Sequence, residues 1–346
     1  MMATRALLRC GLLAALAVLF GASPGFADTT WQDVWNSESA SKRISLQGRA
    51  KTVALTEKGE EHATALIRAA GGKLRLDYEK EDHHWSLVDD GSRLIRLHPS
   101  KRSATFMPRM EMAVDRALAE RNYRARPVGR ATIAGRQTRV IEIAPRRGGL
   151  VAWRLWLDRA TGFALKRERY NVDGKLISGT EFTSVQFKAA IPPDIFAVPS
   201  GWETSEKGGS GERYSLIDLA RHLGFPVVAP SYLPPGYVLQ GGYAEQRGEH
   251  KRLTAALRYT DGLRVLSIYQ RPHQEHEGDR GRGGDRPEGD SDKERGGDAD
   301  RHHLDAGKVA DHGGEKVLRH FSKARVVVVV GDLTADQLTR IAASLD

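Results

Sequence analysis

Short runs of alternating apolar and polar residues, separated by turn signals, extend from Lys42 to Phe187 and constrain the fold more than any other feature. Residues 73–78, KLRLDY, alternate in this way, and a period of two places their apolar side chains on one face of a strand. The sequences DDG at 89–91 and NVDG at 171–174 are typical of hairpin turns. Short strands at hairpin spacing predict a large antiparallel sheet that curls or partly closes into a half-barrel.

Only one helix is evident within this stretch. Residues Arg109–Arg121 carry Met110, Val114 and Leu118 near helical spacing. A helix of about 13 residues is about 20 Å long, which is too short to cover a sheet of about ten strands. The concave face of the sheet is therefore predicted to keep an apolar groove that is open to a guest.

The apolar side chains of the predicted strands are the candidate lipid-binding residues. Residues 153–158, WRLWLD, place a tryptophan on each face of one strand. Taken singly, each residue is better explained as ordinary core, so the groove hypothesis depends on the small helical cover. The candidates are Leu74, Leu76, Tyr78, Trp85, Leu87, Trp153, Leu155, Leu157, Phe163, Leu165 and Phe182.

The first 27 residues have the pattern of a cleaved signal peptide. Two arginines precede the uncharged apolar run Gly11–Ala22, and Gly25 and Ala27 place small residues before a cleavage site after Ala27. The run is shorter than the roughly 20 residues that span a bilayer, which disfavours the alternative of an uncleaved anchor. Cleavage would remove Cys10, the one cysteine, so the exported protein is expected to have no disulfide and no cysteine-built metal site.

A composition shift divides the rest of the chain into two predicted domains. Residues 203–214 are almost free of apolar side chains and rich in glycine, as expected of a linker between a domain at 28–202 and a smaller one at 215–346. In the second domain, capping patterns at Ser215 and Thr334 predict the starts of two helices. Three strands are expected near 237–245, 252–259 and 263–270, and the valine run at 326–330 predicts a buried central strand.

A charged insertion interrupts the second domain at residues 273–316. It contains 13 acidic and 8 basic residues with 10 glycines, a composition that cannot bury enough apolar surface to offset the entropy of ordering, and it is predicted to be a disordered loop. Its histidines lie beside carboxylates and could bind zinc, nickel or copper. Their spacing matches no closed structural site, so no metal is expected. They are His273, His276, His302, His303 and His312.

No catalytic signature is present in the sequence. The HExxH, GxSxG, phosphate-loop and GxGxxG patterns are all missing, so a binding protein without a cofactor is predicted, and an enzyme built from dispersed residues is the least favoured alternative. The formal net charge of +9 favours anionic partners. The arginines are scattered without stacking aromatic residues, which argues against a nucleic-acid partner.

Several segments resemble the MucB/RseB family of periplasmic sigma-E regulatory proteins. In the first domain these are RATIAGRQTRVIEIAP at 130–145 and WRLWLDRATGFALK at 153–166, followed by NVDGKLI and EFTSV. In the second they are LPPGY at 233–237, RYTDGLRVLSIY at 258–269 and VVVVGDL at 327–333. The WRLWLD region is also similar to the LolA-type lipoprotein carriers, and the second domain favours MucB/RseB.

The resemblance implies an α+β fold. A large curved antiparallel half-barrel with helical cover, as in LolA, is followed by a smaller α+β domain. It also implies a periplasmic protein, peripheral to the membrane at most, that binds the periplasmic part of an anti-sigma factor and shields it from site-one proteolysis. Lipoprotein acyl chains or lipopolysaccharide would compete through the apolar face. The alternative function is that of a periplasmic lipoprotein or lipid carrier of LolA type.

Overall fold

The computed structural model describes most of the chain outside the predicted signal peptide and most of the charged insertion. The predicted cleavage site after Ala27 and residues 274–306 lie outside the described residues. The described residues are 29–80, 83–108, 115–206, 212–247, 252–273, 307–322 and 324–346.

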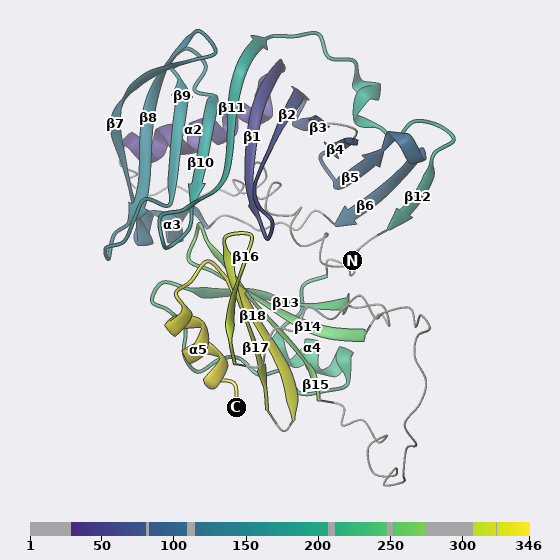
Figure 1. The fold of residues 1–346 in the computed structure, drawn as a ribbon, viewed down its shortest axis with the longest axis vertical. Helices are drawn as coiled ribbons and strands as arrows, with labels where there is room; N and C mark the ends of the chain where they lie inside the picture. The colour runs from purple at the N-terminus through teal and green to yellow at the C-terminus, as the bar shows by residue number, and fades with distance from the viewer. Residues whose placement is uncertain are drawn as a thin grey trace, which may run out of the picture.

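A twelve-stranded sheet dominates the first part of the chain (Figure 1). β1 to β6 pair in succession as antiparallel hairpins, as do β7 to β11, and β1 pairs with β11 across the whole segment, with Leu46 opposite Phe187. The order is β12-β6-β5-β4-β3-β2-β1-β11-β10-β9-β8-β7. The strands are β1 Leu46–Thr56, β2 Gly59–Ala70, β3 Lys73–Lys80, β4 His83–Asp89, β5 Arg93–His98, β6 Ser103–Pro108, β7 Tyr123–Ile133, β8 Arg136–Pro145, β9 Trp153–Asp158, β10 Ala164–Tyr170, β11 Leu176–Phe187 and β12 Glu203–Glu206.

The predicted linker at 203–214 is partly sheet. Its first four residues form β12, which pairs in parallel with β6, and Tyr214 bridges to Gly242 of the second sheet. The composition did not reveal β12 because its four side chains are all exposed, and edge pairing uses backbone groups rather than apolar side chains.

The prediction of a single covering helix is wrong. A longer helix, α2 Thr29–Arg43, lies across the sheet and buries Trp31, Val34 and Trp35 in a cluster with strands of the sheet. These residues follow the i, i+3, i+4 spacing of an apolar helix face. Of the helix predicted at 109–121, residues 109–114 lie outside the described residues, and α3 runs over Arg116–Asn122.

A six-stranded sheet with two helices forms the second part, which confirms the predicted α+β class. Ser215 caps α4 Leu216–Leu223, and Thr334 with Gln337 forms a complete capping box at α5 Ala335–Ala343. The valine run lies in a central strand, as predicted. The strands are β13 Val238–Arg247, β14 Arg252–Thr260, β15 Val265–Pro272, β16 Val309–His312, β17 Glu315–Phe321 and β18 Arg325–Gly331. We refer to α2 through β12 as the large domain and to α4 through α5 as the small domain.

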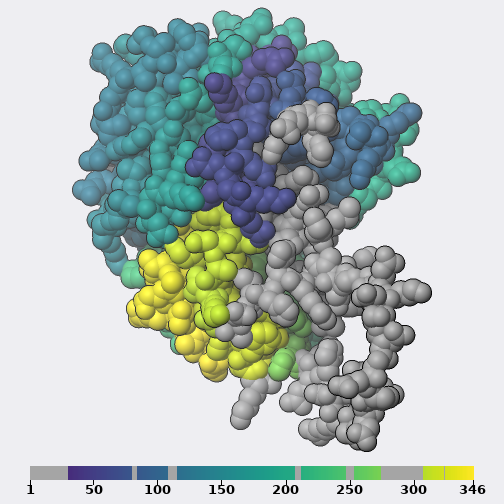
Figure 2. All heavy atoms as spheres, viewed as in Figure 1, coloured from purple at the N-terminus to yellow at the C-terminus, as the bar shows by residue number. Residues whose placement is uncertain are grey.

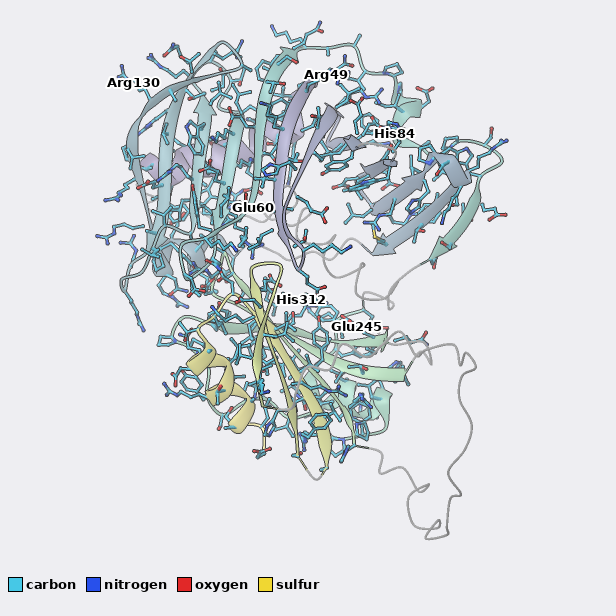
Figure 3. All side chains as sticks on the ribbon, in the orientation of Figure 1. Arg49, Glu60, His84, Arg130, Glu245 and His312 are labelled. Atoms are coloured by element: carbon cyan, nitrogen blue, oxygen red, sulfur yellow. The ribbon has the colours of Figure 1, made fainter. Side chains whose placement is uncertain are left out.

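The predicted disordered insertion extends too far at its C-terminal end. Val309–His312 and Glu315–Phe321 pair as a hairpin, and its tip packs against the large domain. A Cβ at Gly314 would lie 2.2 Å from a side-chain carbon of Ile177. His312 Nδ1 lies within ion-pair distance of Glu57, in the turn between β1 and β2. Figure 3 labels His312 on the side of the small domain that faces the large sheet. β17 also pairs with β18, so the hairpin is the edge of the small domain's own sheet. Composition missed β16 because its four residues lie within a stretch that is rich in charge and glycine.

The turn between β14 and β15 joins the two domains through a buried contact. Leu263 in this turn belongs to the same core cluster as Trp31 of α2 and Tyr123 of β7. Tyr123 donates a hydrogen bond to the Asp261 carboxylate, and Asn122 Nδ2 donates to the Asp261 carbonyl oxygen at 2.8 Å. The small domain therefore completes the core of the large domain, and the two pack directly against each other in Figure 2.

Substitution of Gly262, inside this turn, is expected to weaken the domain contact. Gly262 has φ +103°, and a Cβ there would lie 2.4 Å from the backbone nitrogen of Ala119. Gly262→Ala should lower the free energy of unfolding by about 1–3 kcal/mol from overpacking, beyond the roughly 1–2 kcal/mol cost of the left-handed backbone. Thermal denaturation of the purified protein measures the difference.

Gly91→Ala provides the matched control. Gly91 has a similar φ of +94°, but nothing lies within 4 Å of the point that a Cβ would occupy there. This variant should show the backbone cost alone. Equal losses of stability in the two variants would contradict the tight packing of the turn against α3.

Candidate functional site

A cavity of about 80 Å³ lies between the C-terminal end of α2 and the concave face of the large sheet. About 10–15 Å³ is enough to hold one water molecule, so the cavity can take several waters or a short piece of a ligand. Its mouth is marked by the exposed residues Lys42, Gly72 and Lys73. The lining consists of Ser41, Lys42, Leu46, Ile67, Ala69, Gly72, Lys73, Leu74, Asp89, Phe163, Ala164, Arg167, Thr180 and Phe182.

The cavity forms where small side chains on the sheet meet the end of a helix. Ala69 of β2 pairs with Leu46 of β1, and Ala164 begins β10. Small residues at these positions leave space beneath the last turn of α2, which ends at Arg43. Phe163 and Phe182 form one wall, with their rings edge to face and 5.7 Å apart. An aromatic pair therefore forms one side of the cavity, and the C-terminal end of α2 forms its roof.

The predicted groove residues divide between two clusters. Leu76, Tyr78, Leu87, Phe163, Leu165 and Phe182 are buried in one cluster, with Leu74 and Trp85 packed against it. Trp153, Leu155 and Leu157 belong to the other cluster, beneath Trp31 and Trp35 of α2. Leu74, Phe163 and Phe182 line the cavity. A ligand role for the predicted set remains a prediction, and Trp153, Leu155 and Leu157 could meet a ligand only if α2 moved.

Arg167 is the lining residue that sequence reasoning missed most clearly. A charged residue inside a strand suggests an exposed position, yet the Arg167 residue is only 9% exposed. The signal was its spacing: Leu165, Arg167 and Arg169 alternate along β10, and all three are buried. The guanidinium Nη2 of Arg167 donates a hydrogen bond to Ser41 Oγ of α2 at 3.3 Å.

A second buried charge lies beside the cavity, on α2. Glu38 accepts a hydrogen bond from Arg116 Nη2 at 2.9 Å, while its other carboxylate oxygen is buried without a hydrogen-bond partner. Burial raises the pKa of Glu38 to about 7, against the opposing effects of Arg116, Lys42 and Arg167. Burial likewise lowers the pKa of Arg167 to about 10, although the Glu38 charge acts in the other direction. The cavity wall therefore combines apolar surface with a desolvated cation.

The described residues contain no group of three or more His, Cys, Asp or Glu side chains that could hold a metal ion. His276, His302 and His303 lie outside the described residues. His273 instead packs edge to face with Phe321 at 5.9 Å. Within the same described ranges, no helix is both long and apolar enough to cross a bilayer.

Comparison with known proteins finds a similarity to a bacterial regulatory protein over part of the chain. Residues 67–199 match the family model described as the MucB/RseB N-terminal domain. The chain is 29% identical over 152 residues to the sigma factor AlgU regulatory protein MucB of Pseudomonas aeruginosa. That alignment covers 43% of this chain and 44% of the relative, so it spans less than half the length of the curated protein.

The fold likeness extends over both domains. The structure of the Pseudomonas aeruginosa MucA/MucB complex matches with a TM-score of 0.59 at 19% identity, covering 91% of this chain and 97% of that one. A structure of MucB in complex with MucA(peri) matches with a TM-score of 0.58 at 19% identity, covering 92% and 98%. The arrangement of two sheets is therefore shared with these proteins.

The raised pKa of Glu38 predicts a specific pH dependence of stability. Because the folded-state pKa of about 7 exceeds the ordinary value of 4.5, the folded protein binds this proton more tightly than the unfolded chain. The stabilisation is fully present below pH 4.5 and is lost as the pH rises through about 7. Glu38→Gln should remove this trend and gain stability over the wild type, on the order of 2 kcal/mol, between pH 5 and pH 8.

Chemical denaturation at several pH values measures this difference. Asp336→Asn, at an exposed position on α5, is the control for the loss of one negative charge. A difference between Glu38→Gln and wild type that stays constant from pH 5 to pH 8 would contradict the assignment.

Proposed function

We propose that the chain is a member of the MucB/RseB family and a periplasmic regulator that binds the periplasmic part of an anti-sigma factor and senses lipid or lipoprotein through the cavity. The name of the Pseudomonas aeruginosa relative describes it as a regulatory protein of the sigma factor AlgU, and solved structures of MucB hold MucA as partner. The protein acts by binding, and no catalytic step is assigned to it.

The observation that carries this proposal is the buried contact between the domains. A lipoprotein or lipid carrier of LolA type, the second candidate, needs only a half-barrel with its groove. Here Leu263 of the small domain is part of the core under α2, and Asp332 Oδ1 accepts a hydrogen bond from the backbone N–H of Val172 at 2.7 Å. Because the small domain is built into the core, a function that uses both domains is favoured over a carrier.

The lipid-sensing part rests on the apolar cavity and its helical roof. The described cavity takes only a short segment, so a longer acyl chain requires the end of α2 to lift from the sheet. α2 also packs against Leu263 through the Trp31 cluster. A ligand releases a bound partner only if it binds more tightly to the partner-free state, and a shared helix supplies a physical route for that difference.

The regulator is tested by affinity capture from a membrane extract of the source cells with the mature protein as bait. We expect recovery of a single-span protein with a cytoplasmic anti-sigma domain, and slower cleavage of its periplasmic part by the site-one protease when the bait is added. Gly262→Ala serves as a matched bait in which the docking of the domains is disturbed. It should recover less of the single-span protein than the wild-type bait does. Recovery of lipoproteins alone would overturn the regulator and favour the carrier.

The lipid-sensing part is tested with Leu74→Gln and Val185→Gln. Both residues are half-buried and pack against the same cluster, but Leu74 lines the cavity and Val185 does not. A polar amide in the lining costs about 1–3 kcal/mol, so Leu74→Gln should weaken binding of a fluorescent fatty acid about five- to hundredfold. Val185→Gln should bind it like wild type. Equal binding by wild type and Leu74→Gln would exclude this cavity as the acyl site.

A further inference from the structure

Arg167 is a buried cation without a carboxylate partner. In the parts of the chain that the structure describes, no carboxylate lies within ion-pair distance of its guanidinium, and its hydrogen bond to Ser41 Oγ is long at 3.3 Å. The other deeply buried arginines are paired. Arg264 Nε lies 2.7 Å from Asp332, and Arg258 Nη2 lies 2.7 Å from Glu245. Arg167 therefore differs from Arg264 and Arg258, each of which has a carboxylate partner.

Glu38 does not serve as the missing partner. It attracts Arg167 electrostatically, but its hydrogen-bonded oxygen is taken by Arg116. Its raised pKa also leaves Glu38 partly neutral at pH 7, which reduces the compensation further. Removing a cation from water costs several kcal/mol unless an anion and hydrogen bonds replace the solvent. The described residues leave that requirement unmet.

The position of Arg167 in the cavity indicates which kind of ligand could supply its missing counter-ion. Arg167 lines the cavity together with the apolar side chains of Ile67 and Phe182, while Lys42 and Lys73 stand at the mouth. Against these three cations the lining carries one carboxylate, that of Asp89. A neutral apolar ligand would fill the walls but would leave Arg167 without a counter-ion.

We propose that the cavity binds the anionic group of an amphiphile, a carboxylate or a phosphate, through the guanidinium of Arg167, with the apolar part of the ligand against Ile67 and Phe182. The proposal rests on the lipid-sensing part of the proposed function and adds the chemical class of the ligand. Arg167 is the residue that distinguishes an anionic from a neutral amphiphile. Its planar guanidinium suits either anion because it can donate two parallel hydrogen bonds.

The test compares three probes of equal chain length with the mature protein: decanoate, decyl phosphate and decan-1-ol, each below its micelle-forming concentration. Isothermal titration calorimetry should show that wild type binds at least one of the anions about tenfold or more tightly than the alcohol, which is 1.4 kcal/mol. A preference for decanoate indicates a fatty-acid-like ligand, and one for decyl phosphate indicates a phosphorylated lipid.

Two variants isolate the charge of Arg167. Arg167→Met should bind decan-1-ol as wild type does and lose the preference for the anion, whereas Arg167→Lys should keep part of it. Without ligand, Arg167→Met should unfold at the same temperature as wild type or higher, because an unpaired buried charge is gone. Lys51→Met, at an exposed position on β1 outside the cavity lining, should change anion affinity less than threefold.

The outcomes separate this inference from the function on which it rests. Equal affinity of wild type for the alcohol and both anions would overturn the role of Arg167 and leave lipid sensing intact. Preserved anion preference in Arg167→Met would also overturn it. Binding of none of the three probes would contradict lipid sensing itself. If Arg167→Met does not fold, the affinities of the wild type for the three probes still decide whether the cavity prefers an anionic amphiphile.

Discussion

The buried turn between β14 and β15 determines how the rest of the molecule is organised. Its Asp261 accepts a hydrogen bond from Tyr123, and its Arg264 lies 2.7 Å from Asp332, all within a region almost closed to water. Burial, with the Asp261 charge nearby, raises the pKa of Tyr123 well above its ordinary value, so the phenol stays a neutral donor. Loss of one member would leave a buried charge uncompensated, which is strongly destabilising. The domains are therefore expected to remain docked while this network is intact.

α2 connects that contact to the cavity. Its first turns place Trp31 and Trp35 in the cluster that includes Leu263, and its last turn places Ser41 and Lys42 in the cavity lining. The same helix therefore packs against the buried turn that joins the domains and also lines the cavity. Any ligand that shifts the end of α2 must also disturb the packing around Leu263, because interiors at native packing density do not absorb such a shift locally. Under the proposed function, α2 would couple lipid binding to partner binding, because both sites would shift the position of the same helix.

The sequence predicted those features that depend on neighbouring residues. The caps at Ser215 and Thr334 and the buried valine strand are local patterns, and the structure confirms them. The same reasoning could have predicted α2, because Trp31, Val34 and Trp35 have helical spacing. The polar residues between and around them made this apolar pattern hard to recognise. The burial of Leu263 was beyond reach, since it depends on surfaces that lie more than a hundred residues away in the chain. β16 was missed because its residues share the charged composition of the insertion, although its hairpin pairs with the nearby β18. Of the predicted groove residues, Leu74, Phe163 and Phe182 line the cavity, because the cavity depends on where α2 meets distant strands, and the ligand role of the set stays a prediction.

The contrast among the buried arginines shows how the fold uses charge. Where the domains meet, Arg264 and Asp332 bring their charges together from two segments of the small domain, and the backbone of Val172 closes the network from the large domain. Where α2 meets the sheet, Arg116 forms an ion pair with one carboxylate oxygen of Glu38, whereas the hydrogen-bond partner of Arg167 is a hydroxyl. A permanent pair stabilises one arrangement of the chain, while a cation without a pair makes stability depend on what enters from outside. The Arg264–Asp332 pair fixes the domains in place, and the unpaired Arg167 is the kind of site that the proposed lipid sensing would require.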